Sequence, residues 1–399
     1  MERYIGIFGL ATILGIAYLL SSDRKAIQGR VILWGLALQF LFALFVMKVP
    51  IGITILSAVA NATSELMSKA DAGAAFIFGD LATTDSLGFI FAVKALPIII
   101  FLSSLFAVLY YIGILQWIVR LMARVMVRTM GTSGAESLAT AANVFMGQTE
   151  APLVIAPYID KMTRSELATV MIGGMATISG AVLGVYIGFG AEAEFLLAAS
   201  IMNAPAAIVM AKMLVPETGQ PLTKGEIRLE VERKEVNIID AAARGAGAGM
   251  TLALNIAAML IAFVSLIALV NWPLQAVGLS LEQIFAWLFA PLAYLMGVPW
   301  AESGVVGTLI GQKVIINEFV AYESLGALKS TAAISPRAEL ISTYALCGFA
   351  NISSIAIQIG GIGGLAPTRK EDLARLGLRA LLGGSLATFM TASIAGLLN

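Results

Sequence analysis

Two glutamates occupy short polar stretches of an otherwise strongly apolar chain. Glu150 lies in GQTEAPL at 147–153, and Glu318 lies in NEFVAY at 317–322. An ionised carboxylate at membrane depth is unfavourable unless it faces a cavity or a partner. We therefore predict that both carboxylates accept hydrogen bonds from a polar substrate. For Glu318, an ion pair with Lys313 is the structural alternative, whereas Glu150 has no basic residue close to it in the sequence.

Oxygen donors that could hold a small cation lie near the first glutamate. Gly147 and Pro152 bracket its stretch, and a helix broken there leaves backbone groups unpaired. Such oxygens suit a hard cation. The candidate donors are the carbonyls of Met146, Thr177 and Ile178 and the side chains of Asn143 and Thr177. Ordinary hydrogen bonding between helices is the alternative for the two side chains.

A third polar stretch places an aromatic ring beside an amide and a hydroxyl. Phe349 and Asn351 lie close together, and Ser354 follows one turn later. This combination suits a ligand with a flat ring and hydroxyl groups. Packing against lipid or protein is the alternative for Phe349.

The composition excludes several kinds of catalytic and metal site. The 399 residues include no histidine and one cysteine, Cys347. Nucleophile systems that need histidine, cysteine-cluster metal sites and disulfides within the chain are therefore excluded. The 25 basic residues balance the 25 acidic ones, so no basic surface for nucleic acid is expected. We expect neither an enzyme nor an organic cofactor.

The elements that position these residues are predicted to be membrane helices. Hydrophobic residues make up 59% of the chain and charged ones 13%, against about 25% charged in soluble proteins. A span needs about 20 apolar residues. We predict an all-α polytopic membrane protein with eight spans, at 4–20, 29–47, 93–119, 165–189, 192–213, 249–271, 338–360 and 378–397. The first is interpreted as a membrane helix, because no small-residue cleavage pattern follows it.

Basic residues in the connections orient the spans. Arginine and lysine cluster at 24–30, 120–128, 161–164, 224–234 and 369–379. Cytoplasmic connections are enriched in these residues. With all five clusters inside, the odd-numbered spans run inward and both termini lie outside.

Two segments fit neither spans nor loops. Residues 131–158 begin and end on the inner face in this orientation, and residues 300–328 begin and end on the outer face. We therefore predict two re-entrant helical hairpins that enter from opposite sides. Residues 50–80 mix apolar turns with polar and charged residues, which favours an interfacial helix.

The two hairpins resemble each other. Glu136 and Glu302 precede the two tip glutamates at similar intervals, and each hairpin leads to a span broken by small and polar residues, at 177–180 and 351–354. Opposed units of this kind form an inverted repeat, which is typical of secondary transporters with a site near the midplane. We divide the chain into a scaffold of spans 1–3 with an interfacial helix (1–125), repeat 1 (126–215), scaffold span 6 with interfacial segments (216–297) and repeat 2 (298–399).

Four motifs resemble the concentrative nucleoside transporter family. They are GQTEAPL at 147–153, GMATISG at 174–180, NEFVAY at 317–322 and CGFAN at 347–351. Their order and rough spacing also fit, so the resemblance covers nearly the whole chain. It implies a homotrimer in which each protomer has eight core spans, two opposed hairpins and a moving transport domain.

The resemblance also implies roles for individual residues. The nucleobase would meet Gln148, Thr149 and Glu150, with Val182 lining that side. The ribose hydroxyls would meet Glu318, Asn351 and Ser354, with Phe349 packed beside the ligand. A sodium ion would lie between the first hairpin and span 4, held by Asn143, Met146, Thr177 and Ile178.

The implied function is import of uridine-like nucleosides across a bacterial inner membrane, driven by a sodium gradient through alternating access. The residues Ala151 and Pro152 favour sodium, and a proton-coupled symporter is the alternative. Two rival classes are a channel, and a membrane-embedded enzyme that uses Glu150 and Glu318 as an acid–base pair.

Overall fold

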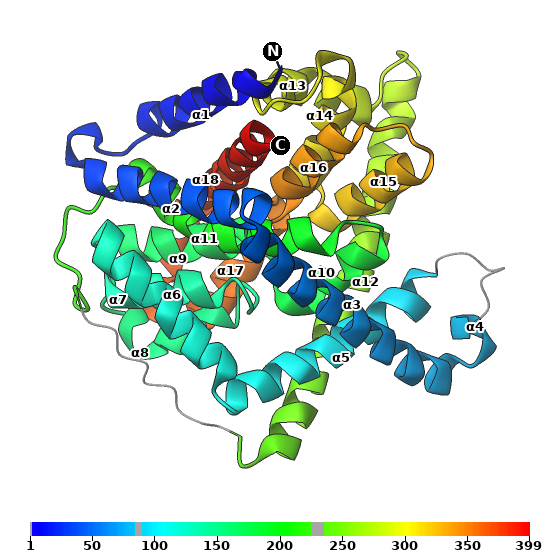
Figure 1. Cartoon of the computed structure of the whole chain (residues 1–399), viewed down its shortest axis with the longest axis horizontal. Helices are drawn as coiled ribbons and strands as arrows, with labels where there is room; N and C mark the ends of the chain where they lie inside the picture. Colours follow the sequence, from blue (N-terminus) through cyan, green and yellow to red (C-terminus); the bar gives the residue numbers. More distant parts are fainter. Residues whose placement is uncertain (1, 84–89, 226–234) are drawn as a thin grey trace.

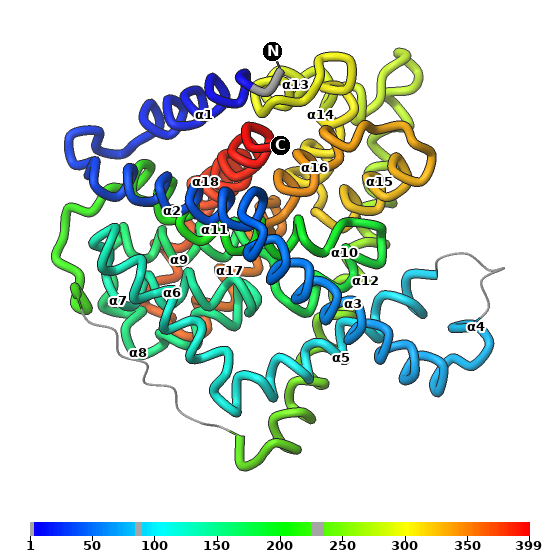
Figure 2. The backbone as a smooth tube through the Cα atoms, in the orientation of Figure 1, coloured from blue at the N-terminus to red at the C-terminus, as the bar shows by residue number. Residues whose placement is uncertain are grey.

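The computed structural model describes residues 2–83, 90–225 and 235–399, and every regular element within these ranges is a helix (Figures 1 and 2). Six helical segments are long and apolar enough to cross a membrane. They are α2 (Gly29–Lys48), α5 (Phe91–Tyr111), α9–α10 (Arg164–Gly188), α11 (Ala193–Leu214), α12 (Ile238–Gln275) and α18 (Lys370–Leu398). The shorter α1 (Glu2–Leu19) and the broken pair α16 (Pro336–Leu346) and α17 (Ile352–Leu365) complete the eight predicted spans.

Both hairpins are present where they were predicted. The first consists of α7 (Gly134–Ala142), a turn, and a return through η3 (Ala151–Ile155) and α8 (Ala156–Ile159). The second consists of α14 (Trp300–Ile315) and α15 (Glu318–Ser330), which are separated by two residues. The predicted all-helical layout of spans and opposed hairpins is therefore confirmed.

Each hairpin leads into a broken span. The helices α9 (Arg164–Ala176) and α10 (Gly180–Gly188) are separated at 177–179, within the predicted break. The helices α16 (Pro336–Leu346) and α17 (Ile352–Leu365) are separated at 347–351, slightly earlier than predicted. The shift arises because Asn351 is the N-cap of α17, and its Oδ1 accepts the backbone N–H of Ser354 at 2.9 Å.

The predicted span 93–119 is present, but it ends earlier than predicted. Helix α5 ends at Tyr111, and α6 (Ile114–Met130) begins after Gly113, whose φ of +92° is a left-handed conformation that favours glycine. One face of α6 is buried at intervals of three or four residues, so this helix is amphipathic. Its exposed face carries the basic residues Arg120, Arg124 and Arg128.

Two further elements differ from the prediction. Helix α12 has 38 residues and is much longer than the predicted span 249–271. Residues 281–295, expected to be interfacial, form the apolar helix α13 (Leu281–Leu295), which is bent by 118° relative to α14. Extensive packing between α13 and α14 explains why this segment is helical.

The N-terminal region includes a long, partly polar helix. Residues 50–80 form α3 (Pro50–Phe78), with Pro50 at its first turn, and α4 (Asp80–Thr83) follows. Figure 1 shows α3 extending from the main body toward α4. Its location at the membrane interface stays a prediction.

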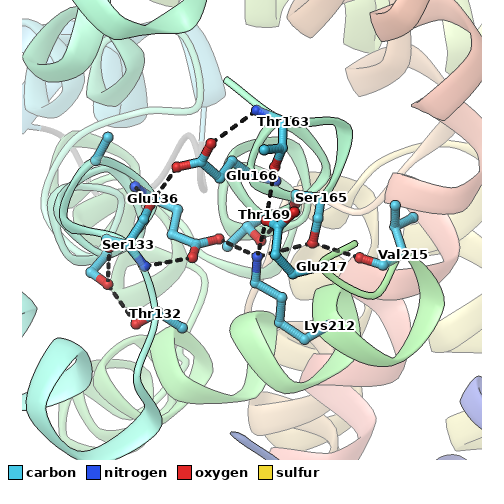
Figure 3. Close-up of polar contacts among 12 residues, drawn as sticks. Thr132, Ser133, Glu136, Thr163, Ser165, Glu166, Thr169, Lys212, Val215 and Glu217 are labelled. Carbon is cyan, nitrogen blue, oxygen red and sulfur yellow. Dashed lines mark hydrogen bonds and ion pairs between the residues drawn. The ribbon is translucent and has the colours of Figure 1, made fainter. Parts of the chain in front are cut away.

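The bases of the two hairpins use related serine–glutamate contacts. In the first, the Ser133 hydroxyl at the N-cap of α7 donates to Oε1 of Glu166 on α9 at 2.5 Å (Figure 3). In the second, the Ser335 hydroxyl at the N-cap of α16 donates to Oε2 of Glu302 on α14 at 2.6 Å. Each contact joins the start of a hairpin to the start of the next span, which supports the inverted repeat.

Candidate functional site

A cavity of about 570 Å³ lies between the two hairpin tips, the two broken spans and α12. Its polar residues come from segments that are far apart in the sequence. All eight predicted substrate residues line it: Gln148, Thr149, Glu150, Val182, Glu318, Phe349, Asn351 and Ser354. The structure therefore brings both tip glutamates to one shared space.

Glu318 is the first residue of α15, and its side chain is buried. Its Oε1 accepts from the Tyr186 hydroxyl at 3.0 Å, and its Oε2 accepts from Nδ2 of Asn351 at 2.9 Å. Each carboxylate oxygen has two lone pairs, so acceptor capacity remains for hydroxyl groups of a ligand.

Lys313 lies near Glu318 in the sequence but has other partners. Its Nζ donates to the carbonyl of Ala345 and to Oγ1 of Thr388, both at 2.8 Å. Among the described residues, Lys313 and Glu318 form no ion pair within 4.0 Å. The alternative of a Glu318–Lys313 ion pair is therefore wrong, and the carboxylate faces uncharged donors instead.

Glu150 lies at the tip of the first hairpin. Its Oε2 accepts a hydrogen bond from the backbone N–H of Gly147. The carboxylate is thereby folded back onto its own turn while the residue lines the cavity. Pro152 is the second residue of the short helix η3 that follows, as expected for a break at this position.

Hydrogen bonds connect the two tips through α17. Nε2 of Gln148 donates to the Ser354 hydroxyl at 3.0 Å. The Ser354 backbone N–H donates to Asn351 Oδ1, and the Asn351 amide donates to Glu318. The predicted base-side and ribose-side residues are therefore parts of one polar network.

The remaining predicted substrate residues complete the cavity wall. Thr149 packs against α17 at Gly361, where an added methyl group would lie 2.6 Å from Thr149 Cγ2. Val182 is buried on α10. Phe349 lies in the α16–α17 break, and its N–H donates to the Thr177 carbonyl at 3.3 Å. This last bond joins the two helix breaks directly.

The predicted cation residues lie where α7 ends and α9 breaks. Asn143 is fully buried, and neither polar atom of its amide has a hydrogen-bond partner. It packs on α9, because a methyl group on Gly173 would lie 3.4 Å from its Nδ2. A buried amide without a partner is costly, and its oxygen is a suitable ligand for a hard cation. The donor set at this position therefore fits sodium.

The other cation candidates have partial hydrogen bonding. Thr177 donates its hydroxyl to the Gly173 carbonyl at 2.9 Å. Ile178 is buried in the break, and Met146 lies in the turn of the hairpin. Ser179, which sequence analysis did not predict, is buried there with an unpartnered hydroxyl.

A second cavity of about 490 Å³ adjoins the first. The two share residues from the first hairpin, the α9–α10 break and α12, namely Gly147, Glu150, Ser179, Ala248 and Leu252. Its other walls include Phe106 and Tyr110 of α5. The tip of the first hairpin therefore borders both spaces.

Sequence analysis missed two cavity residues and one residue that bonds a cavity residue. Tyr186, Thr251 and Asn255 were not predicted, although Thr251 and Asn255 line the cavity from α12 and Tyr186 bonds Glu318. The available signal was weak, because each is a single polar group in an apolar helix.

Family models cover most of the chain. Residues 8–81 match the Na+ dependent nucleoside transporter N-terminus, and residues 195–396 match the corresponding C-terminus. Residues 92–193 match a model described as nucleoside recognition.

Individual relatives agree with the family models. An uncharacterized transporter of Haemophilus influenzae is 48% identical over 409 residues, covering all of this chain and 98% of the relative. Sodium/nucleoside cotransporter 1 of Rattus norvegicus is 40% identical over 418 residues, covering all of this chain but 64% of the relative.

Solved structures have the same fold. CNTnw in an inward-facing substrate-bound state superposes with a TM-score of 0.96 at 45% identity, covering all of this chain and 98% of that one. A CNTnw variant in an outward-facing state gives 0.94 at 42% identity with the same coverage. These matches and the four motifs establish that the chain belongs to the Na+ dependent nucleoside transporter family, the concentrative nucleoside transporters.

Proposed function

We propose that this chain is a symporter that imports nucleosides across a bacterial inner membrane on the sodium gradient. The observation that carries the proposal is the single cavity that both acidic hairpin tips line, beside two broken spans. The names of its relatives support this assignment, since the rat protein is a sodium/nucleoside cotransporter and CNTnw has been solved with substrate.

In this proposal the two hairpins divide the ligand between them. Gln148, Thr149 and Glu150 meet the nucleobase, and Val182 lines that side. Glu318, Asn351 and Ser354 meet the ribose hydroxyls, while Phe349 packs beside the ligand. The free lone pairs of the Glu318 carboxylate support the ribose assignment, and uridine is the expected substrate type.

Sodium is the proposed coupling ion. Asn143, Met146, Thr177 and Ile178 would hold it, and the ion would satisfy the unpartnered amide oxygen of Asn143. Met146 directly precedes the tip residues 147–150, so ordering this turn favours the binding of substrate. The coupling is reciprocal, because substrate must then favour sodium binding to the same degree.

Transport requires that the site open to each side in turn. We propose that the repeats 126–215 and 298–399 form a transport domain that slides along a scaffold of residues 1–125 and 216–297. The second cavity is the proposed route to the cytoplasm, since Tyr110 and Glu235 in its wall lie beside connections predicted to be inside. A homotrimer with both termini outside completes the proposal.

Uptake of labelled uridine into proteoliposomes tests this function. An inward sodium gradient should drive saturable accumulation, and dissipating that gradient should abolish it. Accumulation on a proton gradient without sodium would instead establish the proton-coupled alternative. Flux that neither saturates nor responds to a gradient would identify a channel.

A further inference from the structure

A buried glutamine outside the predicted site joins the first hairpin to the cavity wall. Gln358 lies on α17 and is fully buried. Its Nε2 donates to Oε1 of Gln148 and to the main-chain carbonyl of Met171 on α9, both at 3.0 Å. One amide group therefore connects the hairpin tip, α9 and α17.

The Met171 carbonyl determines the direction of both amides. A carbonyl only accepts, so Gln358 must turn its Nε2 toward it. The second N–H of that group then needs an acceptor, which is Oε1 of Gln148. A reversed amide at either glutamine would place two acceptors or two donors against each other, at a cost of about 1–3 kcal/mol for a buried group.

The orientation of the Gln358 amide leaves one of its polar atoms without a hydrogen bond. Oε1 of Gln358 is buried and has no hydrogen-bond partner. Reversing the Gln358 amide would break its hydrogen bonds to Gln148 and to the Met171 carbonyl and could form at most one new bond. The observed orientation is therefore the more stable one. The unpartnered oxygen is therefore a consequence of fixing Gln148.

The backbone of α9 leaves room for this pair. A methyl group on Gly174 would lie 2.7 Å from Nε2 of Gln358 and 2.9 Å from Cβ of Gln148. Any side chain at this position would separate the two amides. The close approach of α9 is therefore part of the arrangement.

The fixed orientation of the Gln148 amide also determines the hydrogen bonds that lead to the second hairpin. Because Oε1 of Gln148 accepts from Gln358, its Nε2 is left to donate to the Ser354 hydroxyl at 3.0 Å. Ser354 donates its backbone N–H to Asn351, whose amide donates to Glu318. Gln358 thus stands at one end of a chain of hydrogen bonds that reaches both tips.

We propose that Gln358 is a positioning residue that sets the hydrogen-bond polarity of the nucleoside site. It holds Gln148 with the N–H group facing Ser354 and the cavity, so that Gln148 offers a donor to a carbonyl of the nucleobase. The inference rests on the proposed function, because it takes the ligand to be a nucleoside.

A double-mutant cycle tests this role, with uridine affinity measured by thermal stabilisation of the detergent-solubilised protein in sodium. Gln358→Met keeps the side-chain length but removes both donors, so the Gln148 amide can turn. Loss of one fixed hydrogen bond should weaken uridine binding about tenfold. In a Gln148→Met background the same change should have less than about a twofold effect, because the amide that it positions is absent.

The control and the second cycle use other residues of the chain. Gln312 on α14 is a partly buried glutamine outside the chain of hydrogen bonds, so Gln312→Met should change affinity little in either background. If Gln148→Met binds too weakly to titrate, Gln148→Asn, whose shorter amide no longer reaches Gln358, supplies the second background. If Gln358→Met does not fold, Gln358→Asn is used instead. Its side chain keeps an amide but is too short to donate to Gln148.

The outcomes separate the inference from the proposed function. Equal weakening in both backgrounds, or unchanged affinity in Gln358→Met, overturns the positioning role. Failure of the unmodified protein to bind uridine in sodium overturns the proposed function itself.

Discussion

At the scale of the residue, Glu318 is the group on which ribose recognition most depends. Both of its partners, Tyr186 and Asn351, are neutral donors, so no buried cation competes with a ligand for the carboxylate. The negative charge therefore strengthens any hydrogen bond that a ribose hydroxyl makes to it.

Glu318→Gln should retain the fold, because an amide oxygen can still accept from Asn351 and the Tyr186 hydroxyl can rotate to accept. Loss of hydrogen bonds to a charged group should weaken uridine binding by about 10- to 150-fold, from ~1.5–3 kcal/mol, and reduce uptake to background. Uptake and the midpoint of thermal unfolding, Tm, are measured together. Normal uptake by a folded variant would remove Glu318 from the site.

Asn143 tests the sodium assignment. Asn143→Ala removes the buried amide that has no protein partner, so the concentration of sodium needed for half-maximal uptake should rise about tenfold or more. The preference among nucleosides should change much less, since Asn143 does not line the substrate cavity. An unchanged sodium activation curve would contradict the assignment.

The residues of the site could be predicted only where a local motif marks them. The tip motifs and the break residues 177–180 are polar or small within apolar sequence, which is a visible signal. Gln358 and Gln148 are 210 positions apart, and their bond depends on how α17 meets the hairpin. The role of Gln358 therefore required the structure, although a lone glutamine in an apolar helix was a weak indication.

At the scale of the element, α10 and α5 form a close contact between the proposed transport domain and scaffold. A methyl group on Gly184 would lie 2.6 Å from Cγ2 of Ile98 and 2.7 Å from Cδ1 of Leu102. Ile98 and Leu102 are one helical turn apart on α5. Gly184, which has no side chain, therefore lies directly against two neighbouring side chains of α5.

Gly184→Leu should hinder sliding more than binding. We expect uridine uptake to fall about tenfold or more, while sodium-dependent stabilisation by uridine persists, because the cavity residues are unchanged. Gly73→Leu on α3 is the matched control, since nothing lies within 4 Å of a methyl group there. Equal uptake by the two variants would show that this contact does not limit transport.

Element boundaries were predictable where sequence and tertiary packing agree. The break after Ala176 was found, but the break at Gly113 was not, because the apolar pattern continues across it. Helix α13 was predicted only as part of an interfacial segment, because its 15 residues are too few for a span and its packing on α14 is not visible in the sequence.

At the scale of the whole molecule, a buried charge network stabilises the first repeat, and two further basic side chains join it to the second. Lys212 on α11 contacts Glu136 at 2.7 Å and Glu217 at 3.5 Å at the base of the first hairpin (Figure 3). Arg369, just before α18, donates to backbone carbonyls at the end of the same hairpin. Lys329, at the end of the second hairpin, bonds the Gly190 carbonyl and Glu192 of the first repeat.

The Arg369 and Lys329 contacts cross between the repeats, and in both the cation comes from the second repeat. Arg369 belongs to the second repeat and holds the first hairpin, whereas Lys329 belongs to the second hairpin and holds the α10–α11 connection. Contacts between the repeats at both hairpins favour movement of the hairpins as one body rather than separately.

Lys212→Met should destabilise the whole protein. Removing one partner of a buried ion pair costs about 3–5 kcal/mol, because Glu136 is left buried and unpaired. We expect Tm in detergent to fall by several degrees, and the added change Glu136→Gln to restore part of the loss. Arg375→Met, which breaks an exposed pair with Glu371, should cost only about 0–1 kcal/mol. Equal Tm values for the two single variants would contradict a stabilising role for the buried network.

In the proposed function, the two hairpin tips together bind a nucleoside only when sodium is present. Thermal unfolding of the detergent-solubilised protein is the most direct test of this dependence. The unfolding is measured with and without uridine, in sodium and in a sodium-free buffer. Uridine at about 100 times its Kd should stabilise the protein by roughly 2.7 kcal/mol in sodium. It should give no shift without sodium, and in Glu318→Gln the stabilisation in sodium should fall to about 0.3–1.4 kcal/mol. Uridine that fails to stabilise the protein in sodium, or stabilises it equally without the ion, would contradict the account.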